Sequence, residues 1–246
     1  MIGKAAKNFV GKKILEMFQA QNAAVTDTQR AALESGTVGF EASIFAGKPD
    51  WQKFHAMPAP KLTAEEQSFL NNEVNELCES IDDWDVRENL HDLAPETYKI
   101  LKKNKFFGLI IPKRYEGLEF SELAHSEILA KVATRSGTAA VIAMVPNSLG
   151  PAKLIYRYGT EDQKDSMLAK LAKGEEIPCF ALTSDQAGSD ATNIKDVGTV
   201  FKDKDGDVKI KLKWDKRYTT LAPIATVMGL AIQLKDPENI LGKGTE

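Results

Sequence analysis

The sequence predicts an α+β multidomain protein in which an N-terminal all-α helical domain precedes an antiparallel β domain. Between about residues 63 and 171, apolar residues recur at three- and four-residue spacing behind helix-capping residues. Between residues 208 and 214, apolar and charged residues alternate strictly. Because the helical patterns come first and the strand patterns follow, two consecutive packed units are favoured over alternating βαβ units. The pattern changes near Gly174, where we place the boundary.

The composition is that of a soluble globular protein. The chain has 246 residues, of which 43% are hydrophobic and 27% charged, and this excludes disordered, collagen-like and disulfide-scaffold classes. Its 32 Lys and Arg residues are balanced by 35 Asp and Glu, so we expect no nucleic-acid partner. Cys78 and Cys179 are too far apart for a CxxC pair, which indicates a reducing compartment. The longest apolar stretches are far shorter than the ~20 residues of a membrane-spanning helix.

Residues 1–60 are expected to form an N-terminal extension. Residues 1–20 carry several lysines against a single acidic residue, Glu16, with apolar residues between them, which predicts a short basic amphipathic helix. Such a helix can dock on its own protein, the interpretation we favour, or lie on an anionic membrane surface. From Asn22 to Pro60, repeated Gly and Pro break any long period, and we expect an extended arm.

Residues 61–174 are expected to form the helical domain. Helix starts are predicted at Thr63, Pro95, Ser121, Thr138 and Thr160. Thr63 and Thr160 are each followed three residues later by Glu or Gln, which is the capping-box pattern. Proline suits the first turn of a helix, where its missing N–H has no partner to lose, and serine is a preferred N-cap. The apolar helix that starts at Thr138 should be interrupted near Pro146.

Residues 175–246 are expected to form the β domain. Residues 177–183 are a continuous apolar run, residues 208–214 alternate, and residues 224–234 are again compatible with a strand.

Most of the residue types that commonly carry chemistry show no informative pattern. His55, His91 and His125 share no metal-binding spacing, and we expect each at the surface or at a helix cap. The acidic pairs at 82–83 and 203–205 are typical of solvated helix ends or turns. Neither GxGxxG nor GxxxxGK[ST] occurs, so any nucleotide must be held by other means. We therefore expect no metal site.

One segment, residues 180–190, combines a strand with a loop of small residues. Thr183 at the strand end offers a hydroxyl and backbone groups to the polar edge of a ring. Gly188 permits close approach of the backbone, and Ser189 adds a donor for a phosphate. Small-residue loops are common, and by composition alone an ordinary turn is the favoured interpretation.

The order of residues in this loop closely resembles the first signature of acyl-CoA dehydrogenases, in which an aromatic-x-apolar-Thr strand leads into Ala-Gly-Ser-Asp. Further similar segments are 146–151, 158–164, 174–180 and 214–223. Residues 47–53 and 62–67 are similar to the N-terminal extension of the long bacterial branch of the family, which acts in fatty-acid β-oxidation. The resemblance thus covers nearly the whole chain.

The resemblance implies that the chain binds FAD. It assigns the isoalloxazine ring to the signature strand and the phosphates to the loop, with a second strand packing beside the flavin. The cofactor-binding residues so implied are Phe180, Leu182, Thr183, Gly188, Ser189, Tyr218, Thr219 and Thr220. Thr183 would meet the ring near N5. Aromatic side chains can pack on a flat ring, and hydroxyls and amides can tune its electronics.

The reaction implied by the resemblance is α,β-dehydrogenation of a fatty acyl-CoA to a trans-2-enoyl-CoA. A carboxylate removes the α-proton, the β-hydrogen leaves as hydride to flavin N5, and electrons pass to an electron-transfer flavoprotein. The complete form would be a homo-oligomer. The sequence departs from the family where Glu-Pro usually follows the signature threonine, since Ser184 and Asp185 stand there, and Gln186 replaces a commonly acidic residue.

The resemblance also implies that the chain is an N-terminal fragment with an incomplete β domain. The catalytic base is expected beyond Glu246, so no catalytic residue is assigned. The expected location is the cytoplasm, with peripheral contact at the inner face of the bacterial cytoplasmic membrane. Two alternatives remain open: an acyl-CoA oxidase, and a non-catalytic helical interaction or membrane-surface module that retains the front half of the family.

Overall fold

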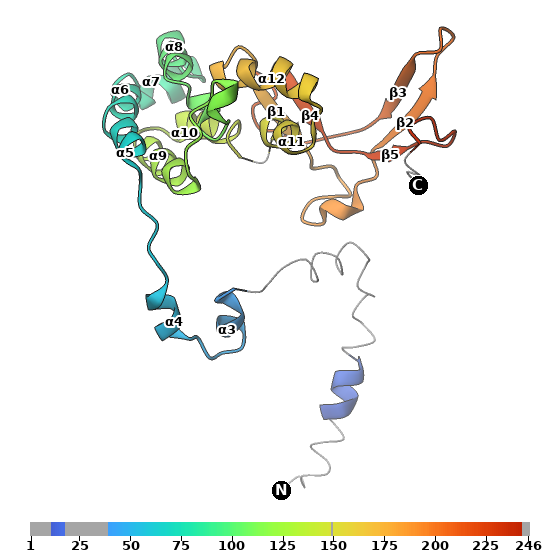
Figure 1. The fold of residues 1–246 in the computed structure, drawn as a ribbon, viewed down its shortest axis with the longest axis horizontal. Helices are drawn as coiled ribbons and strands as arrows, with labels where there is room; N and C mark the ends of the chain where they lie inside the picture. Colours follow the sequence, from blue (N-terminus) through green and yellow to red (C-terminus); the bar gives the residue numbers. More distant parts are fainter. Residues whose placement is uncertain (1–10, 18–38, 149, 243–246) are drawn as a thin grey trace, which may run out of the picture. The chain divides into compact units, whose positions relative to one another are not determined.

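The computed structural model describes residues 11–17, 39–148 and 150–242 (Figure 1). The chain divides into two compact units, Met1–Ala59 and Pro60–Glu246, and each is described by itself.

The first unit contains more helix than the extended arm expected from the sequence. Residues 11–17 are helical and exposed, whereas the rest of the basic helix expected over 1–20 lies outside the described residues. Two short helices follow, α3 (Glu41–Phe45) and α4 (Trp51–Ala56). The expectation of an extended arm is therefore wrong over these residues. Asp50 caps α4 by accepting a hydrogen bond from Lys53 N at 2.9 Å, a local interaction that the glycines and prolines nearby concealed.

The second unit begins with a helical region (Figure 1). Its α-helices are α5 (Ala64–Asn71), α6 (Glu73–Glu79), α7 (Asp83–Asp85), α8 (Pro95–Lys103), α9 (Glu122–Arg135), α10 (Gly137–Met144), α11 (Pro151–Tyr158) and α12 (Glu161–Lys173). A π-helix, η1 (Val86–Leu90), and two 3₁₀-helices, η2 (Phe106–Gly108) and η3 (Lys113–Tyr115), lie between them.

The predicted helix starts are confirmed with two adjustments. Thr63 and Thr160 form complete capping boxes, Ser121 caps α9, and Pro95 opens α8. The first helix is broken at Asn72, whose ψ of −72° ends α5 and begins α6. The apolar helix begins one residue before Thr138, at Gly137, because Ser136 is its cap.

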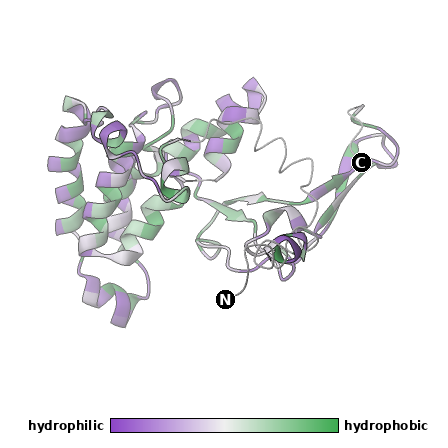
Figure 2. Cartoon of the chain, turned by 90° about the horizontal axis from the view of Figure 1, so that it is seen from below, coloured by the Kyte–Doolittle hydropathy of each residue, from purple (hydrophilic) through white to green (hydrophobic). Residues whose placement is uncertain are grey.

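The helices bury one large apolar core. Its fully buried side chains include Leu77, Ile81, Leu101, Phe106, Phe107 and Ile128. Figure 2 shows hydrophobic and hydrophilic stretches alternating along the bundle helices, as expected for helices that bury one face. Each such side chain contributes roughly 1.5–3 kcal/mol when it leaves water.

The second unit ends in two small sheets. Strand β1 (Pro178–Ala181) pairs in parallel with β4 (Val227–Leu230), and α11 packs against both. Strand β2 (Val197–Lys202) pairs antiparallel with β3 (Val208–Lys213) and parallel with β5 (Gln233–Lys235). A short 3₁₀-helix, η4 (Ala191–Asn193), precedes β2.

The pairing differs from the antiparallel arrangement expected from the sequence. Within the described residues, only the β2–β3 hairpin is antiparallel, whereas the other two strand pairs are parallel because the chain leaves β1 and β2 and returns to each in the same direction. Strand β2 was not predicted, since Gly198 interrupts its apolar residues. A Cβ on Gly198 would meet the ends of the Ile232 and Ile210 side chains, so these side chains would have to shift to admit a larger residue.

Candidate functional site

The two segments assigned to the flavin by resemblance lie side by side. Residues 182–190 follow β1, and residues 214–220 follow β3. Arg217 N donates to the Thr183 carbonyl at 3.0 Å, and Lys216 Nζ donates to the Leu182 carbonyl at 2.9 Å. Arg217 also donates to Asp185 Oδ2 at 2.7 Å across the same junction. The structure therefore brings together residues that are more than thirty positions apart in the sequence.

The two segments carry hydroxyl groups without partners inside the described residues. Thr183 and Thr219 are half-buried, and Thr220 and Ser189 are exposed. Within the described residues, none of these side-chain hydroxyls takes part in a hydrogen bond. They are free to serve as donors or acceptors for a polar ligand.

The loop that contains Gly188 is anchored by hydrogen bonds, and the space beside Gly188 is open. Ser184 and Ala187 exchange backbone hydrogen bonds of 3.2 Å, and Asn193 Nδ2 donates to the Gln186 carbonyl at 2.9 Å. A Cβ built on Gly188 would meet no atom within 4 Å. The packing of the chain itself thus does not require a glycine here, and the space beside Gly188 is available to a ligand.

The predicted aromatic residues differ in their surroundings. The half-buried Phe180 ring lies against Gly229 on β4, where an added Cβ would be 2.7 Å from Phe180 Cδ2. Tyr218 is 85% exposed. Residues 218–220 do not form the strand that the resemblance implies, because Tyr218 and Leu221 have φ values of +56° and +67°, outside the extended region. Leu182, in the facing segment, is half-buried.

Cavities adjoin the junction on two sides. A polar cavity of about 480 Å³ lies between the loop and the β2–β3 hairpin; its lining includes Ser184, Gln186, Lys195, Asp196 and Trp214. An apolar cavity of about 540 Å³ lies between α10 and the segment that follows Thr220; its lining includes Val141, Ile142, Leu221, Pro223 and Ile224. Thr183, Ser189, Thr219 and Thr220 line neither of these two cavities, whereas their chain neighbours Ser184 and Leu221 line one each.

Lys216 and Asp196 form a buried ion pair in this region, which the sequence did not predict. Lys216 Nζ lies 2.6 Å from Asp196 Oδ2, and the two side chains are only 1% and 6% exposed. Asp196 Oδ1 accepts a hydrogen bond from Asp215 N at 2.7 Å. Burial would raise the pKa of Asp196, but hydrogen bonds from Lys216 and Asp215 N outweigh it and lower that pKa. The partners are twenty positions apart in the sequence, so no local pattern marks them.

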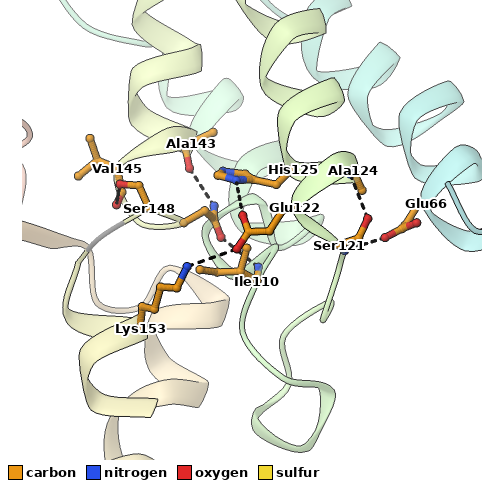
Figure 3. Close-up of polar contacts among 11 residues, drawn as sticks. Glu66, Ile110, Ser121, Glu122, Ala124, His125, Ala143, Val145, Ser148 and Lys153 are labelled. Carbon is orange, nitrogen blue, oxygen red and sulfur yellow. Dashed lines mark hydrogen bonds and ion pairs between the residues drawn. The ribbon is translucent and has the colours of Figure 1, made fainter. Parts of the chain in front are cut away.

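The helical region holds a second group of polar residues (Figure 3). Glu122 Oε1 lies 3.3 Å from Lys153 Nζ, and Glu122 Oε2 lies 3.9 Å from His125 Nδ1. The His125 side chain is only 12% exposed, so its expected surface position is wrong: α9 turns it toward the neighbouring helices. Burial lowers the pKa of His125 below its ordinary value, which favours the neutral ring.

Asn147, from one of the segments that carry the resemblance, has a structural role. It is 2% exposed, donates to the carbonyls of Phe106 and Ala143, and accepts from Ile110 N. These hydrogen bonds link the end of α10 to the connector that contains Phe106 and Ile110.

Other kinds of site are not seen in the part of the chain that the structure describes. There, no three His, Cys, Asp or Glu residues are placed to hold a metal ion. None of the described helices combines the length and apolar character needed to cross a bilayer. Asp82 and Asp203 accept backbone hydrogen bonds at a helix cap and in the β2–β3 turn.

The residues at the junction fit a flavin nucleotide. A flavin needs a surface for its flat ring, polar groups for the ring edge, and open backbone for its phosphates. The two segments offer one feature of each kind: the exposed Tyr218 ring, the Thr183 hydroxyl and the open space beside Gly188. The two cations of the junction are each paired with a carboxylate, Lys216 with Asp196 and Arg217 with Asp185.

Comparisons with known proteins identify the helical region. Residues 61–175 match the family model of the acyl-CoA dehydrogenase N-terminal domain. The chain is 32% identical over 160 residues to a 3-(aryl)acrylate reductase of Clostridium sporogenes, covering 65% of this chain and 39% of that protein. It is 29% identical over 219 residues to the probable acyl-CoA dehydrogenase FadE10 of Mycobacterium tuberculosis, covering 85% of this chain and 33% of that protein.

Solved structures share the fold. Butyryl-CoA dehydrogenase from Megasphaera elsdenii superposes with a TM-score of 0.60 at 23% identity, covering 70% of this chain and 45% of that chain. The chain thus spans less than half the length of these relatives. From the family model that matches them, we conclude that residues 61–175 belong to the acyl-CoA dehydrogenase N-terminal domain family, and the named relatives are similar to the chain beyond this domain.

Proposed function

We propose that the protein is an FAD-dependent acyl-CoA dehydrogenase that converts fatty acyl-CoA to trans-2-enoyl-CoA in β-oxidation. The observation that carries the proposal is the junction of residues 182–183 with residues 216–217, which brings the two segments assigned to the flavin side by side. Bound FAD would supply the hydride acceptor. Family membership and relatives such as the human mitochondrial very long-chain specific acyl-CoA dehydrogenase, 26% identical over 172 residues, support this choice of reaction.

The residues of this chain would hold and orient the flavin. Phe180, Leu182 and Tyr218 would contact the ring, and the hydroxyls of Thr183, Thr219 and Thr220 would face its polar edge. Gly188 and Ser189 would approach the phosphates. The base that removes the α-proton is assigned to no residue of this chain.

The remaining parts of the proposal concern organisation and partners. Residues 61–174 would form the helical domain, residues 175–246 part of the β domain, and residues 1–60 the extension. An electron-transferring flavoprotein of Acidaminococcus fermentans is among the structural neighbours, with a TM-score of 0.59 at 24% identity. We propose such a protein as the electron acceptor, a homo-oligomeric holoenzyme, and peripheral contact with the cytoplasmic membrane through the basic N-terminal residues.

A second candidate is the reverse reaction, reduction of an activated enoyl group. Two relatives that are each 32% identical are named 3-(aryl)acrylate reductase and acryloyl-CoA reductase (NADH). Assays of the full-length natural protein in both directions distinguish the two candidates. Turnover of a saturated acyl-CoA with an artificial electron acceptor, without reduction of the enoyl product by NADH, supports the dehydrogenase. Acceptor-independent turnover with oxygen would instead identify an oxidase.

The flavin site is tested by Gly188→Val in the full-length natural protein. Because no atom lies within 4 Å of the new Cβ, the variant should fold with an unchanged melting temperature. The valine side chain would fill the open space, so we expect loss of the flavin absorption band from the purified protein. Gly188→Ala should give a smaller loss. Full flavin retention by Gly188→Val contradicts the assignment of this loop to the cofactor.

A further inference from the structure

The segment of residues 182–183, which follows β1, is held by a hydrogen bond from the buried side chain of Lys216. Lys216 has 1% of its side chain exposed, and its ammonium group contacts the Leu182 carbonyl at 2.9 Å and Asp196 Oδ2 at 2.6 Å. A charged lysine is rarely so deeply buried unless it is paired. The Leu182 carbonyl belongs to the peptide that precedes Thr183, so Lys216 fixes the orientation of that peptide.

Asp196 holds the lysine in place. Its Oδ1 accepts from Asp215 N at 2.7 Å, and its Oδ2 pairs with the Lys216 ammonium group. The Asp196 carbonyl accepts from Gln233 N at 2.8 Å, which ties the carboxylate to the start of β5. The aspartate is thus anchored through its own backbone and through the residue next to Lys216.

The neighbouring residue, Arg217, adds a separate connection. Its amide donates to the Thr183 carbonyl at 3.0 Å, so the carbonyls on both sides of Thr183 Cα are held by consecutive residues of the other segment. Asp185, which stands where the family usually has proline, pairs with the Arg217 guanidinium. Lys216 differs from Arg217 because its side chain is buried, whereas Arg217 is exposed.

We propose that Lys216 is a positioning residue for the flavin: by holding the Leu182 carbonyl, it sets the orientation of Thr183, and Asp196 keeps it there. This inference rests on the proposed flavin site. Other charges around Lys216 are Asp185, Asp215 and Arg217, all exposed, and they do not satisfy its buried ammonium group. A charged hydrogen bond contributes roughly 1.5–3 kcal/mol, equivalent to an effect of about 10- to 100-fold.

The test compares variants of the full-length natural protein. Replacing Lys216 alone would leave the Asp196 carboxylate buried and unpaired, which destabilises a protein strongly. The double variant Asp196→Asn with Lys216→Met removes both charges, and the oxygen of the new amide can still accept from Asp215 N, so it should fold. We expect its Kd for FAD to rise about tenfold or more. Lys216→Arg, which keeps the charge and the donors, should rescue most of this loss.

Two readouts separate positioning from general stability. Hydrogen exchange at the Arg217 amide should be faster in the double variant, without FAD present, while exchange in the core helices is unchanged. The control Lys211→Met removes an exposed lysine of β3 and should alter neither exchange nor FAD affinity. The inference is overturned if hydrogen exchange at the Arg217 amide is the same in the double variant as in the wild type. It is also overturned if this exchange is faster but the Kd for FAD and the flavin absorption spectrum are unchanged. Failure of the wild-type protein to bind FAD overturns the proposed function itself, and is recognised separately because it is seen before any substitution.

Discussion

Glu66 is a buried carboxylate that serves the starts of two helices. Its Oε2 accepts from Thr63 N and its Oε1 from Ser121 N, each at 2.7 Å, and the residue is 4% exposed. Figure 3 shows the second of these contacts beside Ser121. Burial would raise the pKa of Glu66, but the backbone hydrogen bonds from Ser121 and Thr63 outweigh it and lower the pKa from 4.5 to about 2.

We predict that Glu66→Gln lowers the free energy of unfolding at pH 7 by roughly 1–3 kcal/mol, because the amide nitrogen cannot accept a backbone hydrogen bond. The folded-state pKa lies below the unfolded one, so the carboxylate stabilises the protein above about pH 4.5. That stabilisation is lost as the pH falls toward 2. Urea unfolding at several pH values should therefore show a difference between wild type and variant that shrinks over this range.

The matched control is Glu65→Gln, one residue earlier. Glu65 is exposed and pairs with Lys113 at the surface, where such ion pairs contribute little. We expect a change below about 1 kcal/mol. An equal loss of unfolding free energy in both variants would contradict a stabilising role for the two backbone hydrogen bonds that Glu66 accepts.

At the scale of single helices and strands, the sequence predicts the features that depend on residues close together in the chain. The capping boxes at Thr63 and Thr160 involve residues three apart, and both are confirmed. The strand β2 and the parallel pairing of β1 with β4 depend on distant contacts. The same holds for the site: Thr183 and Gly188 stand out in the sequence, but the ion pair of Lys216 with Asp196 exists only in the fold.

We predict that Gly108→Ala destabilises the packing of η2 against α12. A Cβ on Gly108 would lie 2.8 Å from both Cα and Cβ of Ala172, so backbone would have to move, at a cost of about 1–3 kcal/mol. Thermal unfolding measures the loss. As a control, Gly137→Ala adds a methyl group in α10 where nothing lies within 4 Å, and its melting temperature should be unchanged or slightly higher. Equal behaviour of the two variants would contradict the close contact.

At the scale of the whole molecule, the two compact units contribute unequally to stability. Among the described residues, every buried apolar side chain belongs to the second unit. The first unit instead exposes apolar side chains such as Phe45, which is 92% exposed, and Trp51, which is 56% exposed. We therefore assign the cooperative core, and the proposed flavin site, to the second unit.

Removal of residues 1–59 should separate membrane contact from folding and flavin binding. We expect the truncated protein to keep its melting temperature within about 2 °C, because the core lies in the second unit. Its FAD affinity should also be unchanged. The lysines of residues 1–20, each worth about 1 kcal/mol near an anionic surface, are lost with the deletion. Intact protein should therefore sediment with vesicles containing phosphatidylglycerol and be released by salt, whereas truncated protein should stay in solution. If the truncated protein sedimented with the vesicles as fully as the intact protein, residues 60–246 would supply the membrane contact. The N-terminal residues would then be excluded as that contact.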